Sequence, residues 1–158
     1  MPKIGKNCFI AENAAIIGDV VIGDDCSIWY GAVLRGDVNS IRLGNRVNVQ
    51  DNASIHTTYK KSVSILGDDV SVGHNAVIHG ATIGAGSLVG MGSVVLDNVE
   101  IAPGSIVAAG AVVLAGSKLD QGVYAGVPAK KVKDGSPQVT ETAGHNARQY
   151  MMYKDWYK

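Results

Sequence analysis

The sequence predicts an all-β protein: a parallel β-helix in the form of a triangular prism, built from hexapeptide repeats and followed by a C-terminal α-helix. Three observations predict this fold. Aliphatic residues recur every six positions, small residues and turn formers occupy fixed places after them, and 20 glycines occur among 158 residues without low complexity. A period of six fits neither a helix nor a flat strand, which have periods of 3.6 and 2.

The repeat extends from Ile4 to Leu119. Its aliphatic positions are Ile4, Ile10, Ile16, Ile22, Ile28 and Leu34, then Leu43, Val49 and Ile55, then Leu66, Val72 and Ile78, and finally Ile83, Val89, Val95, Ile101, Val107, Val113 and Leu119. We expect these side chains to point inward. Each repeat then forms one side of the prism, and three repeats form one coil of eighteen residues.

The fourth position of the repeat is almost always Asn, Asp or Gly, residues that tolerate positive φ, so the chain is expected to turn there. These residues are Asn7, Asn13, Asp19, Asp25, Gly31, Asp37, Asn52, Asp69, Asn75, Gly86, Gly92, Asn98, Gly104, Gly110 and Gly116. The fifth position is small and includes Cys8 and Cys26. Those two cysteines lie one coil apart, and we expect buried free thiols rather than a disulfide.

The chain divides into a β-helix domain, residues 1–125, and a connector with a C-terminal helix, residues 126–158. The segment GVPAKKV leaves the coil, and Pro137 with a cap at Thr140 or Thr142 precedes the predicted helix over 141–158. We expect the aromatic residues and methionines of this helix to pack along the prism. The lone His145 is expected at the surface.

Composition excludes several classes of function. The formal net charge is zero and no basic run occurs, so nucleic-acid binding is not expected. No apolar run approaches the ~20 residues of a membrane span, and the N-terminus lacks a signal-peptide core. We therefore expect a cytoplasmic protein. The stretch GAGSLVGMG lies inside the repeat and lacks the GxGxxG register of a nucleotide site.

Three histidines occupy informative positions in the repeat. Arg35, His56 and His79 share one position on the third side of successive coils, so the two imidazoles are expected to stack at the ~4.8 Å strand spacing. That spacing suits a metal ion at ~2.0–2.1 Å from both. His74 shares a column with Asp51 on the second side, and it can join the other two if a second subunit packs against the first.

Such a set of three neutral histidines with an open fourth position is typical of catalytic zinc, although iron or cobalt also binds imidazole. Three subunits around a threefold axis would form three equivalent sites, which predicts a homotrimer.

The motifs narrow the interpretation further. The repeat resembles the left-handed parallel β-helix family, and the handedness is implied by that resemblance. The stretches SIWYGAVLRGD, NVQDNASIH and VGHNAVIHG resemble the γ-class carbonic anhydrase family over nearly the whole chain. The resemblance implies zinc bound by His56 and His79 of one subunit and His74 of the next. It further implies an interface pair, two residues near the metal-bound water and a tyrosine near the metal: Arg35 with Asp37, Gln50 with Asp51, and Tyr124.

The function that follows is the reversible hydration of carbon dioxide to bicarbonate by a zinc-bound hydroxide at a trimer interface. Here Gln50 would orient the hydroxide and Asp51 would support the site. Three alternatives remain. A metal-dependent acyl-CoA thioesterase would share the metal, and an acetyltransferase would use a single histidine as base. A non-catalytic metal-binding assembly protein would keep the prism but could lose its metal without losing its partner.

Overall fold

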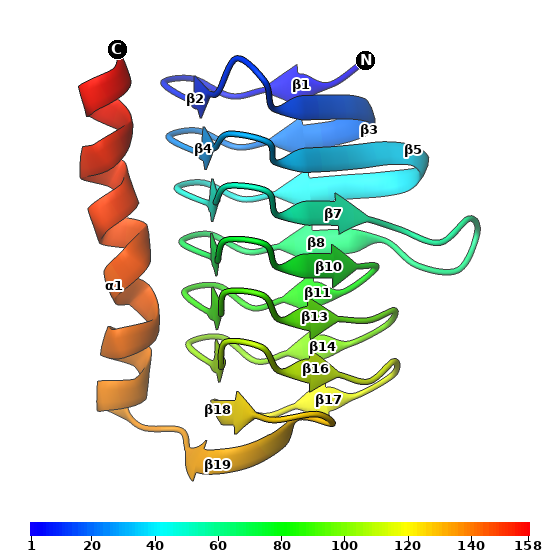
Figure 1. Cartoon of the computed structure of the whole chain (residues 1–158), viewed down its shortest axis with the longest axis vertical. Coiled ribbons are helices and arrows are strands. Elements are labelled where there is room, and N and C mark those ends of the chain that lie inside the picture. The colour runs from blue at the N-terminus through cyan, green and yellow to red at the C-terminus, as the bar shows by residue number, and fades with distance from the viewer.

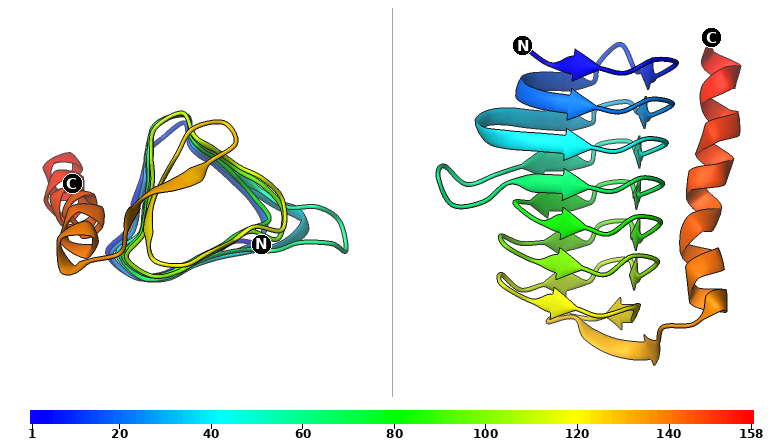
Figure 2. Two further views of the ribbon diagram at one scale, coloured as in Figure 1. Left: turned by 90° about the horizontal axis from the view of Figure 1, so that it is seen from below. Right: turned by 180° about the vertical axis from the view of Figure 1, so that it is seen from behind.

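Short parallel strands stack in register to form the three sides of a prism, and one helix runs beside it (Figure 1; Figure 2). The computed structural model describes residues 1–158. The first and third sides form one 11-stranded sheet: β1 (Lys3–Ile4), β3 (Ala15–Ile22), β5 (Val33–Leu43), β7 (Ser54–His56), β8 (Ser64–Leu66), β10 (Val77–His79), β11 (Thr82–Ile83), β13 (Val94–Val95), β14 (Glu100–Ile101), β16 (Val112–Val113) and β17 (Lys118–Leu119).

The second side, here called the second face, forms a separate 8-stranded sheet. Its strands are β2 (Phe9–Ile10), β4 (Ser27–Ile28), β6 (Asn48–Val49), β9 (Ser71–Val72), β12 (Leu88–Val89), β15 (Ile106–Val107), β18 (Gly122–Ala125) and β19 (Lys130–Asp134). All of these strands pair in parallel except β19, which returns antiparallel to β18 and crosses the open end of the prism. The sequence predicted only a connector in this region.

The coils wind in the left-handed sense around a continuous apolar core (Figure 2). Twenty-six buried residues form this core, and they include the period-six aliphatics from Ile22 to Val113. Adjacent coils align these positions directly, as in the register of Ile28 with Val49 and of Val49 with Val72. Burial of one aliphatic per repeat therefore fixes the register, and the predicted left-handed β-helix with a C-terminal helix is confirmed.

Positive φ occurs at twelve of the fifteen predicted turn positions, all except Asn13, Asp19 and Asp37. The last two lie in the long strands β3 and β5, which continue from the third side onto the first without the usual turn. At this corner Gly18 has φ +79, and a Cβ built on it would lie 2.2 Å from the carbonyl oxygen of Gly36. The backbones of two coils therefore approach too closely here for any side chain.

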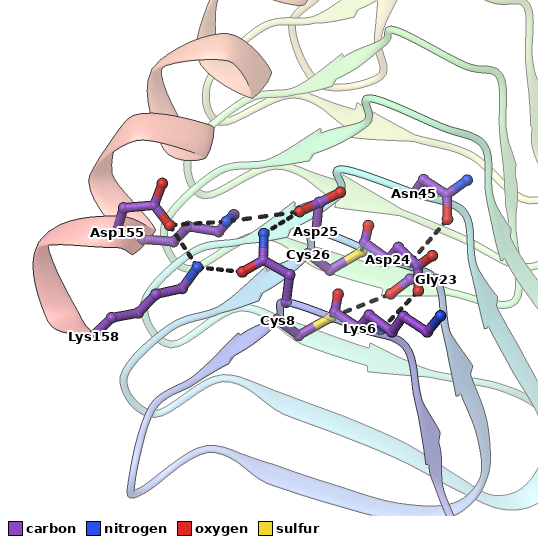
Figure 3. Close-up of polar contacts among 11 residues, drawn as sticks. Lys6, Cys8, Gly23, Asp24, Asp25, Cys26, Asn45, Asp155 and Lys158 are labelled. Atoms are coloured by element: carbon purple, nitrogen blue, oxygen red, sulfur yellow. Dashed lines mark hydrogen bonds and ion pairs between the residues drawn. The ribbon is translucent and has the colours of Figure 1, made fainter.

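The two cysteines are free thiols stacked at one corner (Figure 3). Cys8 Sγ lies 3.2 Å from the carbonyl oxygen of Gly23, and Cys26 Sγ lies 3.2 Å from that of Gly44 on the next coil. Burial raises the pKa of Cys26 to about 12. The thiols thus act as small corner residues that donate to backbone carbonyls. Both are free, as the sequence predicted, but only Cys26 is fully buried, and Cys8 is partly exposed.

The C-terminal helix α1 (Pro137–Tyr153) begins earlier than the sequence predicted and continues into a 3-10 turn, η1 (Lys154–Tyr157). Its N-cap is Ser136, whose hydroxyl accepts a hydrogen bond from the backbone N–H of Val139. Pro137 then occupies the first turn, where a missing N–H costs nothing. The expected cap at Thr140 or Thr142 was wrong, because both lie inside the helix. No helix is long and apolar enough to cross a membrane.

The helix packs against the second face and runs antiparallel to the stacking of the coils (Figure 1). Its first half buries Val139, Ala143 and Ala147, which recur every four residues. Its last half contributes aromatic rings, and Tyr150 and Tyr157 each lie 5.3 Å from the ring of Trp29. The contacts of Tyr150 and Tyr157 with Trp29 agree with the prediction, whereas Met152 and Trp156 are exposed.

Candidate metal centre

Two imidazoles meet on the third side of the prism. Strands β7 and β10 pair so that His56 and His79 are direct register partners, as the repeat predicts. His56 Nδ1 lies 3.2 Å from His79 Nε2, and the ring centroids are 5.2 Å apart. Arg35 lies in the same column one coil earlier, because Leu34 pairs with Ile55.

The outer nitrogen of His56 is held by Asp37. His56 Nε2 lies 2.9 Å from Asp37 Oδ1, while Arg35 Nη1 donates to Asp37 Oδ2 at 2.6 Å. These hydrogen bonds, that from His56 first and that from Arg35 second, hold the pKa of the Asp37 carboxyl below its usual range. Asp37 is therefore ionised at neutral pH and accepts the proton of His56 Nε2.

The outer nitrogen of His79 is held by Asp97. His79 Nδ1 lies 3.1 Å from Asp97 Oδ2, and Asp97 Oδ1 accepts from the hydroxyls of Thr58, at 2.8 Å, and Ser62. Partial burial acts to raise the pKa of Asp97, but the hydrogen bonds from Ser62, Thr58 and His79 outweigh it and lower the pKa. Asp97 is thus a carboxylate that fixes the ring of His79.

These bonds determine which nitrogens carry lone pairs. When Asp37 and Asp97 each accept a proton from one neutral ring, His56 Nδ1 and His79 Nε2 are left bare and face each other at 3.2 Å. Two lone pairs at this distance repel unless a cation lies between them. Two ligands at ~2.0–2.1 Å from a tetrahedral zinc ion would be roughly 3.3 Å apart, so the donor pair fits such an ion.

His74 lies on the second face, apart from this pair. Its Nδ1 is 3.2 Å from Asp51 Oδ1, and its side chain is 39 % exposed. No group of three metal-ligating side chains occurs within the single chain. The structure therefore brings two of the predicted ligands together and places the third on a different face of the prism.

Gln50 is buried beneath the helix and is only 3 % exposed. Its side-chain amide donates to Asn48 Oδ1 at 3.0 Å, and Asn48 in turn donates to the hydroxyl of Ser71 at 2.7 Å. The amide shares a cavity of about 190 Å³ with Asn146 of α1, whereas its neighbour Asp51 lies at the exposed edge. Gln50 thus belongs to a hydrogen-bonded polar row between the second face and α1.

Tyr124 lies apart from these residues. It takes the column position of Val107 in β18, three coils beyond Val72, or roughly 14 Å along the prism. Its hydroxyl bonds to Asp120, at 2.8 Å from the backbone oxygen and 2.7 Å from Oδ1. Burial, followed by the hydrogen bond to Asp120, raises its pKa. We therefore leave Tyr124 out of the proposed centre.

Sequence reasoning missed Asp97 and Asn48. Asp97 follows the aliphatic Val95 by two positions, one coil after His79, and Asn48 precedes Val49 at a buried position. The available signal was the repeat itself, because a carboxylate next to the histidine column and a buried amide on the second face both need partners. Thr58 and Ser62 belong to a loop outside the repeat, so no spacing rule could place them.

Comparisons with known proteins agree with this architecture. The bacterial transferase hexapeptide (six repeats) family model matches residues 1–36 and 80–115. Protein YrdA of Escherichia coli is 42 % identical, over 99 % of this chain and 89 % of its own. The carbonic anhydrase of Geobacillus kaustophilus is 46 % identical over 63 % of this chain and 54 % of its own.

A hexapeptide transferase family protein from Anaplasma phagocytophilum superposes with a TM-score of 0.91. The two chains are 39 % identical, and the match covers 99 % of this chain and 93 % of that one. Together these similarities define the class as hexapeptide-repeat β-helix proteins. Within that class, the chain belongs to the family of γ-carbonic-anhydrase-like proteins. It spans about half the length of the curated carbonic anhydrases that it matches.

Proposed function

We propose that this protein catalyses the reversible hydration of carbon dioxide to bicarbonate at metal centres shared between the subunits of a homotrimer. The observation that carries the proposal is the facing pair of bare nitrogens on His56 and His79, each ring held from behind by a carboxylate. The similarity to carbonic anhydrases gives the reaction class.

The third ligand is His74 of a neighbouring subunit. Within one chain it lies on a different face from His56 and His79, and its side chain, 39 % exposed, is accessible to another molecule. If the second face of each subunit meets the third side of the next, the contact is heterologous and closes into a ring of three. Each subunit then contributes two ligands to one centre and one ligand to another.

Three neutral imidazoles without a thiolate match a catalytic zinc site with an open position, and iron or cobalt would also fit this donor set. A bound zinc ion would supply an activated water molecule near neutral pH. Asp37 and Asp97 hold His56 and His79 in the tautomers that leave their facing nitrogens bare, and Asp51 Oδ1 lies 3.2 Å from His74 Nδ1.

The remaining residues shape the centre. Gln50, fixed by Asn48, would present its amide to the reacting oxygen atoms beside His74. Arg35, which is ion-paired to Asp37, lies on the exposed part of the third side and would contact the neighbouring subunit.

The shared centre is tested by mixing two inactive variants. His56→Ala and His74→Ala should each lose metal as homotrimers. When they are co-assembled, some interfaces combine the intact third side of the His74→Ala chain with the intact second face of the His56→Ala chain. Metal analysis and a carbon dioxide hydration assay should show recovery of both zinc and activity. If mixed trimers form and neither returns, the assignment of His74 to the neighbour is wrong.

An acyl-group enzyme is the second candidate, because a hexapeptide transferase family protein is similar over almost the whole chain. A thioesterase would need the same metal, whereas an acetyltransferase would need only one histidine as base. Assays of anaerobically purified protein with carbon dioxide and with an acyl-CoA, each before and after metal removal, separate these functions from a non-catalytic assembly role.

A further inference from the structure

We propose that the β7–β8 loop of one subunit docks into an aromatic cavity of the neighbouring subunit, with a lysine ammonium as the inserted group. The loop, here called the basic loop, is residues 57–63. The inference rests on the subunit arrangement of the proposed function, and it adds a second contact between the same two chains.

The aromatic cavity lies between the second face and the C-terminal turns, and its volume is about 230 Å³. Six of its seven lining side chains are aromatic, and the seventh is the carboxylate of Asp51. Trp29 forms the buried wall, with its indole N–H bonded to Ser27 at 2.9 Å. Trp156, 68 % exposed, and Tyr157 form the open rim.

This lining favours a cation. Aromatic faces attract an ammonium group through their quadrupole, and tryptophan attracts it most strongly. The carboxylate of Asp51 adds a negative charge, and no lysine or arginine of the same chain pairs with it. A long side chain with an apolar stem and a terminal ammonium group matches both parts of the cavity.

The basic loop offers such side chains. Tyr59 is 62 % exposed, and Lys60 and Lys61 beside it are exposed and form no ion pair. The ammonium of Lys60 lies 5.1 Å from the centroid of its neighbour Tyr59. The base of the loop is fixed, because the backbone N–H of Thr58 donates to the hydroxyl of Ser62 at 2.9 Å. The tip therefore projects from a firm base, at a corner of the prism far from the helix (Figure 2).

The basic loop of one subunit and the aromatic cavity of the next must lie close together if the metal centre is shared. The loop begins directly after His56, and the cavity includes Asp51, whose Oδ1 lies 3.2 Å from His74 Nδ1. Joining His56 of one chain to His74 of the next therefore brings the loop beside the neighbour's cavity. Four residues from His56 to Lys60 span at most ~14 Å, which is the distance from His56 within which the lysine backbone must lie. Within one chain the loop cannot reach its own cavity, because the prism lies between them (Figure 2).

Disulfide cross-linking tests this docking in the full-length, metal-loaded protein. Tyr59→Cys and Trp156→Cys are combined in a Cys8→Ser background, where the remaining Cys26 is buried. Mild oxidation should link chains into covalent dimers and trimers on a denaturing gel. The matched control pairs Tyr59→Cys with Val132→Cys, an equally exposed site on β19 at the far end of the prism, and should give no link.

Fluorescence quenching provides a second measurement without cysteines. In the wild-type trimer we expect Trp156 to be shielded from acrylamide, and in the Lys60→Ala, Lys61→Ala double variant we expect it to become accessible. The docking is wrong if no cross-link appears and Trp156 is already accessible in the wild type. The proposed function still stands in that case, provided that zinc binds, mixed trimers form and the His74 variant is complemented in trans. If neither trimers nor metal are found, both proposals fail.

Discussion

Replacing Asp97 with asparagine should weaken metal binding without changing the fold. The hydroxyls of Thr58 and Ser62 donate to one side of the Asp97 carboxylate and would retain the amide oxygen there. The amide nitrogen would then face His79 Nδ1, donor against donor. His79 must shift its proton to Nε2, the nitrogen that faces His56, and the site loses one lone pair.

The expected size of this effect follows from the lost hydrogen bond. A hydrogen bond to a charged group contributes about 1.5–3 kcal/mol, and each 1.4 kcal/mol is about tenfold in affinity, so we expect zinc affinity to fall roughly 10- to 100-fold. Competition with a chromogenic chelator measures the change on trimers checked for mass. Glu100→Gln is the control, because Glu100 is an exposed carboxylate 3.7 Å from Lys118. Unchanged zinc affinity in Asp97→Asn would refute the tautomer argument.

Two further predictions concern the scaffold. Cys26 is buried and its pKa is raised to about 12, so only about one thiol in 10⁴ is ionised at pH 8 and the native protein should resist alkylation there. The thiol should react fully once the chain is unfolded, and intact mass spectrometry measures the alkylation of both states. Ser136→Ala removes the N-cap of α1 and should lower the free energy of unfolding by about 1 kcal/mol in a urea titration, while Thr142→Ala, whose hydroxyl bonds only within the helix, should change it little. Rapid labelling of native Cys26, or equal effects of the two helix variants, would contradict these interpretations.

The prism could be predicted because every repeat carries the same signal, a buried aliphatic residue at a fixed position. Each coil buries an aliphatic such as Ile28, Val49 or Val72 at the same place, so a fixed period specifies the inward positions and the register together. The same period placed His56 next to His79 and set His74 on another face. The path of the backbone sets these positions, so the period of the repeat is sufficient to predict them.

The features that escaped prediction depend on side chains or on segments outside the repeat. The contact between Asp97 and His79 needs the basic loop, since Thr58 and Ser62 position the carboxylate. The cap at Ser136 was missed because the choice between neighbouring Ser and Thr residues depends on where the helix meets the prism. The antiparallel return of β19 depends on pairing that its charged sequence does not reveal.

The length of the C-terminal helix matches the height of the prism. It leaves the last coil and reaches the first, where Tyr157 lies 5.2 Å from Phe9 and the side chain of Lys158 bonds to Asn7. One extra coil would raise the stack by ~4.8 Å, and a helix rises ~1.5 Å per residue, so about three added helical residues would have to accompany every eighteen added to the repeat. Natural variants that gain or lose a coil should therefore change the length of this helix in the same proportion.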